Sequence, residues 1–514
     1  MLMRIFHPRI CTVALRRDGG NNDFFSKAGK MKRKRRYIAF FFSLIFFTLL
    51  GCRRQTTDEF PVFTENLSVT SAATENTFET APGESVSLPR LSAALPITQE
   101  IMDQLIRLYS AKQLSSSHSN SSVDLDGVQI ENQEPLFAVD VIPVPETGAT
   151  VEDILLWPKS SMTIPDIIYA EKISDLVTGN ILLPLDMYLA DNSLFLSTRM
   201  YTSSLEPCRV RSTLYGIPFR GAARVLFLDT EIIENAGIAE VPYLLDINGF
   251  TLISERVASL PSEETPPEQW VLPLYDAGDL LALLPSSFSQ QAGWFTYREN
   301  RFHFDSPSFM DSISFLREYR QAGNTAEAMT DEQRSMLFAE TDPRFSGHVA
   351  MWVGRMDELD EYSRNGTRKI SFSQIPSATY GETTPPAVTV FPLCISAETN
   401  YPDLAASFAS FLALDEDALL LQNESFTQPL FPLVTSEKVW ASLYDDDTTP
   451  KSLWASLRTG LQSAYFDPET GPKKLSEKID GLIAENKSIL LDSEMNVTDV
   501  INILLASTEF GAAG

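Results

Sequence analysis

The residues of this 514-residue chain that could do covalent chemistry are not spaced as a catalytic site. A Gly-x-Ser-x-Gly nucleophile motif, a Walker phosphate loop and a Gly-x-Gly-x-x-Gly loop are all absent from the sequence. The histidines beyond the leader, His118, His303 and His348, show neither metal nor catalytic-triad spacing. A glycosidase that uses two carboxylates stays an open alternative, because the sequence has 68 acidic residues and does not identify which two would form such a pair. We therefore do not expect an enzyme.

The acidic clusters of the sequence do not match a metal site. Asp124-Leu125-Asp126-Gly127 superficially resembles a calcium loop, but the matching first and last positions are Ser122 and Gln133. The leading carboxylate and the bidentate glutamate that calcium needs are thus both missing. We expect no metal and no cofactor.

The overall charge excludes a further class of partner. Lys and Arg total 41 against 68 Asp and Glu, which gives a net charge of -27. Such a chain repels the phosphate backbone, so we expect no nucleic-acid partner.

The N-terminal segment has the features of a bacterial export signal. The positively charged segment 31–36 precedes the apolar run 37–50, which is shorter than the ~20 residues of a membrane-spanning helix. Leu49-Leu50-Gly51-Cys52 resembles a lipobox, so we expect residues 1–51 to be leader and signal peptide and Cys52 to be lipidated. Residues 52–89 are rich in Ser, Thr, Glu and Pro and predict a disordered tether. The protein is expected to be anchored by lipid on the outer face of the cell membrane.

The elements that position the remaining residues follow an α/β pattern. The apolar run Val225 to Leu228 predicts a strand, with Asp229 or Thr230 as the N-cap of a helix that Gly237 ends. Ser306-Pro307 predicts the start of a helix that ends at Gly323, and Pro402 predicts the start of another. Alternating runs of this kind are typical of an α/β fold.

Several separated segments, in the same order, resemble the family 1 extracellular solute-binding proteins, relatives of the maltodextrin-binding protein. The segments are Pro165-Asp166-Ile167-Ile168, Leu183-Pro184-Leu185-Asp186, Leu214-Tyr215-Gly216-Ile217-Pro218, Val225 to Gly237, Gly347-His348-Val349-Ala350-Met351, Phe391-Pro392-Leu393-Cys394-Ile395-Ser396 and Tyr401-Pro402-Asp403-Leu404-Ala405. The resemblance covers about Leu91 to the C-terminus and is weakest over the first lobe.

The resemblance implies two α/β lobes that bend about hinge crossings and hold a ligand in the cleft between them. The crossings are expected near Gly216 to Arg224, Val388 to Phe391 and Gln428 to Leu433. The expected boundaries are 90–220 for lobe 1, 221–388 for lobe 2, 389–430 for the return to lobe 1 and 431–514 for C-terminal helices of lobe 2.

The resemblance also implies a function. We expect a monomeric lipoprotein that captures a small solute, with a sugar or oligosaccharide as the expected class, and delivers it to an ABC import permease. A tethered sensor or scaffold without a transporter stays an alternative, because it would share the whole fold.

Sugar sites combine aromatic platforms with planar polar side chains. The ligand-binding candidates at positions that the resemblance places near the cleft or hinge are Trp352, Trp294, Arg355, Tyr215, Arg220, Trp157 and Asp166. Core packing or a surface ion pair is the competing interpretation of each. Cys208 and Cys394 remain for the mature body, either as two buried thiols or as one disulfide.

Overall fold

The computed structural model describes residues 88–117, 134–157, 163–260, 270–326, 329–338, 342–359, 361, 368–423, 425–426, 429–443, 451–471 and 473–511. These residues belong to the compact unit Ser85–Gly514. The leader, Cys52, most of the tether and His118 lie outside the described residues. No helix within the described ranges is long and apolar enough to cross a bilayer.

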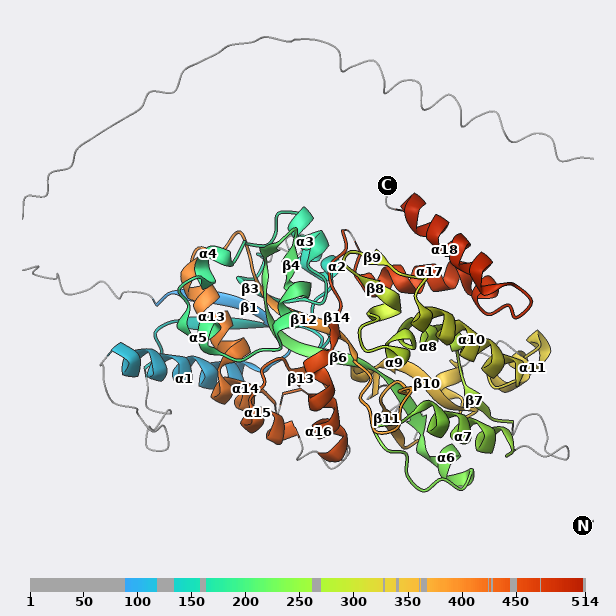
Figure 1. Cartoon of the computed structure of the whole chain (residues 1–514). Coiled ribbons are helices and arrows are strands. Elements are labelled where there is room, and N and C mark those ends of the chain that lie inside the picture. The colour runs from blue at the N-terminus through green and yellow to red at the C-terminus, as the bar shows by residue number, and fades with distance from the viewer. Residues whose placement is uncertain are drawn as a thin grey trace, which may run out of the picture. The chain divides into compact units, whose positions relative to one another are not determined.

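The first lobe is built on one sheet (Figure 1). Its strands, in spatial order, are β2 (Ala138–Pro143), β1 (Arg90–Leu95), β3 (Ile167–Tyr169), β12 (Ala387–Ile395) and the first half of β6 (Gly216–Asp229). β1 is parallel to β2 and β3, whereas β12 is antiparallel to β3 and β6. β13 (Phe431–Pro432) pairs with β6, and β14 (Tyr465–Phe466) with β12. β4 (Arg209–Val210) and β5 (Thr213–Leu214) form a separate hairpin.

Helices of the first lobe pack around this sheet. They are α1 (Gln99–Ser117), α2 (Val151–Leu156), α3 (Ser174–Thr178), α4 (Asp186–Leu189), α5 (Ser193–Ser197), η4 (Thr202–Cys208), α13 (Pro402–Leu414), α14 (Glu416–Asn423), α15 (Glu437–Ser442) and α16 (Lys451–Gly460). α13 packs on β6 and β12, and α1 packs on β2. α13 starts with Pro402 at its first turn, as the sequence predicts.

The second lobe is built on the second half of β6. This half pairs with β10 (Val349–Arg355) on one side and β11 (Ile370–Ser373) on the other, and β7 (Leu272–Leu274) is parallel to β10. The helices of this lobe are α6 (Thr230–Asn235), α7 (Ile247–Ala258), α8 (Ala277–Leu283), α9 (Pro285–Phe288), α10 (Pro307–Gln321), α11 (Asp331–Phe338), α17 (Leu475–Leu490) and α18 (Val497–Gly511). η6 (Trp294–Thr296) precedes a hairpin of β8 (Tyr297–Arg298) and β9 (Arg301–Phe302).

Two sequence-predicted helix boundaries are confirmed. Asp229 caps α6 by accepting a hydrogen bond from the Ile232 amide, and Gly237 follows with φ 77°. α10 begins at Pro307 and is followed by Gly323 with φ 80°. A positive φ is easy for glycine and costly for other residues, so both glycines end their helices.

The first crossing between the lobes is made by one continuous strand, β6. β6 pairs with β12 as far as Ala223 and with β10 from Arg224 onward. The third crossing differs from the prediction at Gln428 to Leu433, because β13 pairs there with Arg220 and Gly221 in the first-lobe half of β6. The chain reaches α17 later, through β14. Trp440 on α15 stacks on Phe431, and Trp454 on α16 packs against both Trp440 and Phe372 of β11.

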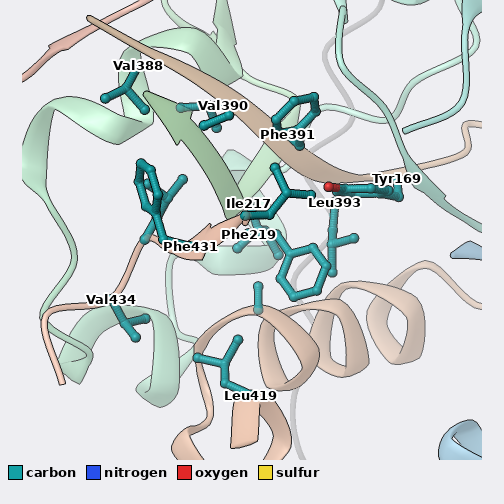
Figure 2. Close-up of a cluster of buried hydrophobic side chains, with 14 of the residues drawn as sticks. Tyr169, Ile217, Phe219, Val388, Val390, Phe391, Leu393, Leu419, Phe431 and Val434 are labelled. Atoms are coloured by element: carbon teal, nitrogen blue, oxygen red, sulfur yellow. The ribbon is translucent and has the colours of Figure 1, made fainter. Parts of the chain in front are cut away.

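Apolar packing holds the crossing strands in place. Figure 2 shows Ile217 and Phe219 of β6 with Val390 and Leu393 of β12 in one cluster. Leu419 of α14 lies in the same cluster. Strands buried on both faces read as continuous apolar runs, which matches the composition of β12.

Candidate functional site

The strands of both sheets end at one place. β3 is antiparallel to β12 and β12 is antiparallel to β6, so the parallel set β1, β2 and β3 points toward the end where β6 leaves the first sheet. β10 is antiparallel to β6 and parallel to β7, so these strands point back toward the same place. We call this place the junction, and it consists of Glu171–Ile173, Arg224, Tyr275–Asp279, Arg355–Asp357 and Asp467–Glu469. Ligands of open α/β sheets bind at such carboxyl ends.

Arg355 ends β10 and reaches across the junction. Its Nη1 donates to Glu171 Oε1 of the first lobe at 2.5 Å, and its Nε and Nη2 donate to the two oxygens of Asp357 at 2.6 and 2.7 Å. The guanidinium carbon lies 5.3 Å from the centre of the Phe391 ring on β12. Burial alone would lower the pKa of Arg355, but the hydrogen bonds and charges of Asp357 and Glu171 raise it above its ordinary value.

The two residues after Glu171 also bond to segments that lead into the second lobe. Lys172 Nζ lies 3.2 Å from Glu477 Oε1 on α17. The Ile173 amide donates to Glu469 Oε1, between β14 and α17, at 3.2 Å. Burial raises the pKa of the Glu469 carboxyl.

The second-lobe side of the junction combines an aromatic ring with charges. The Arg224 guanidinium lies 5.3 Å above the ring of Trp294, and its Nη2 donates to Asp480 on α17 at 3.1 Å. Arg224 Nε and Trp294 Nε1 are buried without a hydrogen-bond partner among the described residues. Asp279 lies on α8, which packs against both η6 and α17. Burial and the charge of Asp276 raise the pKa of Asp279 to about 7.

Of the sequence-predicted residues, the structure brings Arg355 to the junction. Trp294 lies beside Arg224 of the junction, but it is 2% exposed. Trp157 follows α2 and is half-buried against the apolar cluster around Ile154 and Ala170. Trp352 lies on β10 three residues before Arg355, but it is 1% exposed and packs beside Phe227.

Arg220 is fully buried in the first lobe. Its guanidinium lies 4.3 Å from the Phe426 ring and 4.9 Å from the Phe219 ring, and its Nη1 donates to Asn423 at 2.8 Å. Burial lowers the pKa of Arg220 to about 10. The residue packs the strand rather than facing the junction.

Tyr215 and Asp166 lie at the opposite end of the first-lobe sheet, which we call the far end. Tyr215 precedes β6, nine residues before Arg224, which corresponds to roughly 30 Å of extended strand. Asp166 precedes β3 and accepts hydrogen bonds from the Ser92 amide and hydroxyl at 2.7 and 2.9 Å. These positions are separated from the junction by the length of their strands.

Sequence reasoning missed Glu171, Asp279, Glu469 and Asp480. A usable signal exists for Glu171, because it follows directly after the predicted Pro-Asp-Ile-Ile strand. The others stand on or before helices whose packing the sequence does not reveal.

The part of the chain that the structure describes contains neither a metal site nor an exposed thiol. No group of three His, Cys, Asp or Glu residues is arranged there to hold a metal ion. Cys208 and Cys394 are free and buried, and burial raises the pKa of both thiols.

A pocket of about 520 Å³ lies away from the junction, between α5, α14 and the segment before α15. Its charges are largely neutralised within the protein. Lys112 bonds to Asp415 at 2.6 Å and to Asp417 at 2.8 Å, and Lys438 bonds to Asp417 at 2.9 Å. Nothing in this pocket marks it as a solute site.

Comparison with known proteins gives a family match. The sequence model of the bacterial extracellular solute-binding protein family matches residues 146–419. No curated protein sequence matches the chain.

Solved structures share the fold at low identity. An ABC substrate-binding protein from Listeria monocytogenes in complex with cycloalternan has a TM-score of 0.55 at 12% identity, and the match covers 83% of this chain and 100% of that one. The cyclic alpha-maltosyl-1,6-maltose binding protein from Arthrobacter globiformis has a TM-score of 0.54 at 13% identity, over 82% and 97%. UgpB from Mycobacterium tuberculosis, in complex with glycerophosphocholine, has a TM-score of 0.53 at 10% identity, over 83% and 98%. At these identities the likeness shows the fold, a two-lobed binding-protein architecture.

Proposed function

The chain belongs to the family of bacterial extracellular solute-binding proteins, and on that premise we propose that it captures a sugar or oligosaccharide at the junction and delivers it to an ABC import permease by closing its lobes. The observation that carries the proposal is the convergence of the strand ends of both sheets on one junction. The structural neighbours named for cycloalternan and cyclic maltosyl-maltose support the sugar class.

The side chains of the junction suit a sugar. A pyranose has an apolar face that stacks on an aromatic ring and hydroxyls that pair with planar polar groups. Trp294 supplies the ring, and the buried Nε1 of Trp294 and Nε of Arg224 lack protein acceptors among the described residues. We assign Trp294 as the aromatic platform. Because 2% of Trp294 is exposed in this structure and Arg224 lies over its ring, the assignment requires Arg224 to move off the ring when sugar binds. Trp352 and Arg220 contribute through packing, and Asp166 contributes through its hydrogen bonds to Ser92.

The proposal predicts stoichiometric binding without turnover. A solute at one hundred times its dissociation constant stabilises the native state by about 2.7 kcal/mol if the unfolded chain does not bind it. Calorimetry with cycloalternan, cyclic maltosyl-maltose and glycerophosphocholine, after a thermal-shift screen of sugars, polyols and peptides, measures this. We expect a sugar to bind one to one and to be recovered unchanged. Conversion of the solute to product, or stabilisation by peptides alone, would contradict the proposal.

A matched pair of tryptophan variants locates the site. Trp294→Ala removes the proposed platform, whereas Trp440→Ala removes a buried tryptophan whose Nε1 donates to Val434 of the first lobe. Both variants should lose stability, but only Trp294→Ala should weaken sugar binding. Equal affinities in the two variants would remove Trp294 from the site.

We also propose that the protein is held to the membrane by a lipid on Cys52, as the lipobox-like segment before it indicates. Cys52→Ala should move the protein from the membrane fraction to the soluble fraction or leave it unprocessed. An unchanged distribution and mobility would contradict the anchor.

A further inference from the structure

The segment Glu171–Lys172–Ile173 makes three contacts in succession, each to a different partner segment. Glu171 bonds to Arg355 at the end of β10, Lys172 to Glu477 on α17, and the Ile173 amide to Glu469 before α17. β10 and α17 belong to the second lobe, since their apolar residues Val353 and Ile479 share its core.

We propose that Glu171–Lys172–Ile173 is an interlobe clasp that stabilises the closed state, and that Arg355 serves as its counterpart rather than as a contact to the solute. The proposal rests on the proposed function, because it assumes that capture requires closure.

The hydrogen bonds of Arg355 support its role as the counterpart of the clasp rather than as a contact to the solute. Its Nε, Nη1 and Nη2 all donate to carboxylates in the structure, so none of the three nitrogens lacks an acceptor. Asp357 is nearly fully buried, with 2% of its side chain exposed, and fixes the guanidinium by a bidentate bond. Arg355 is therefore held in position by its own lobe, and of its hydrogen bonds the one to Glu171 is the one that separation of the lobes would break.

The exposure of Glu171 limits how much the Glu171–Arg355 ion pair can stabilise the closed state. The Glu171 side chain is 39% exposed and the Arg355 side chain is 21% exposed, so water partly screens the pair. Removing the pair should therefore change solute affinity only modestly. The apparent affinity of a protein falls with the fraction of its binding-competent state. We expect Glu171→Gln to raise the solute dissociation constant and the off-rate about threefold, which is within the range for exposed ion pairs.

A distance measurement without solute tests the clasp directly. Spin labels on Met187→Cys in α4 and Tyr380→Cys in the β11–β12 connection report on the two lobes, because these native side chains are 85% and 83% exposed. Glu171→Gln and Lys172→Gln should each shift the distance distribution of the full chain toward the open state. Asp140→Asn is the matched control, because it removes the exposed Arg90–Asp140 pair within the first lobe. This control should leave the distribution unchanged.

Salt dependence supplies a second readout that packing alone would not move. Raising the salt concentration from 0.05 to 1 M should open the parent chain more than the Glu171→Gln variant, since screening weakens the pair that the variant has already lost. Distributions that are identical in the parent, Glu171→Gln and Lys172→Gln would overturn the clasp. Because no solute is needed, this outcome is separate from a failure of sugar capture, which calorimetry on the parent chain would reveal.

Discussion

The two ends of the first-lobe sheet carry the same kind of residue and use it differently. At the far end, the Asp166 carboxylate accepts hydrogen bonds from the Ser92 amide and hydroxyl within its own lobe. At the junction end, about five residues along the same segment, the Glu171 carboxylate bonds to Arg355 of the other lobe. Residue type therefore does not locate the site. The direction of the strand does, because the carboxyl ends of the parallel strands β1, β2 and β3 face the second lobe and their amino ends do not.

The largest effect expected from this comparison concerns Trp352, which lies close to the junction in sequence but inside the core. Trp352→Ala should lower the free energy of unfolding by about 3–5 kcal/mol, as truncation of buried aromatic residues does. The affinity of the folded fraction for sugar should stay unchanged. Denaturant unfolding and calorimetry on one preparation measure both quantities, and a loss of affinity with intact stability would move Trp352 into the site.

A substitution at the far end should change the stability of the protein but not its sugar affinity. Asp166→Ala leaves the Ser92 amide and hydroxyl without their acceptor and should cost about 1–3 kcal/mol of unfolding free energy. Its sugar affinity should equal that of the parent chain in calorimetry. A change in affinity here would break the distinction between the two ends.

Asp279 gives the junction a pH dependence. An unfolded aspartate has a pKa of about 3.9, whereas burial and Asp276 raise the folded pKa of Asp279 to about 7. Between pH 4 and pH 7 the folded state thus keeps a proton that the unfolded state has released, so this group lowers stability as pH rises through that window.

The variant Asp279→Asn should remove this pH dependence of stability. Asp279→Asn should gain stability relative to the parent chain as pH rises from 4 to 7, by up to about 1.4 kcal/mol per pH unit, and the difference should level off above pH 7. The exposed Asp311 on α10 provides the control variant Asp311→Asn. Parallel stability curves for the parent and Asp279→Asn would show that Asp279 titrates normally.

The smallest effect is expected at Arg220. Among the described residues it has no ion pair, and the burial that lowers its pKa to about 10 shows the cost of its charge. Arg220→Met replaces that buried charge with an apolar side chain, so stability should change by less than about 1 kcal/mol or rise. Loss of sugar affinity, measured by calorimetry, would contradict the assignment of Arg220 to packing.

Much of the fold could be predicted from local signals. The strand at Val225 to Leu228, the cap at Asp229 and the glycine stops at Gly237 and Gly323 depend on neighbouring residues, and all appear in the structure. The third crossing could not be predicted in the same way. It depends on the contact of Trp440 with Phe431 and the pairing of β13 with β6, which are tertiary interactions.

The site was harder to predict because residue types do not reveal the register or the direction of a β-strand. Trp352 and Arg355 are three residues apart on β10, so they point to opposite faces of the strand, and the sequence offers both as candidates. Tyr215 precedes the first crossing in sequence, but the length of β6 separates it from the junction. Ile173 and Glu469 become neighbours only when β14 returns to β12.

Hydrogen exchange of the chain with and without the sugar that binds in calorimetry tests the central claim, that solute is held where the strands of both lobes end. We expect slower exchange at the backbone amides of residues 170–175, 275–280 and 355–358 in the complex. We expect unchanged exchange at 88–92 and 209–216, at the far end of the first-lobe sheet. Protection confined to the far end, or none at the junction while the sugar is bound, would contradict the account.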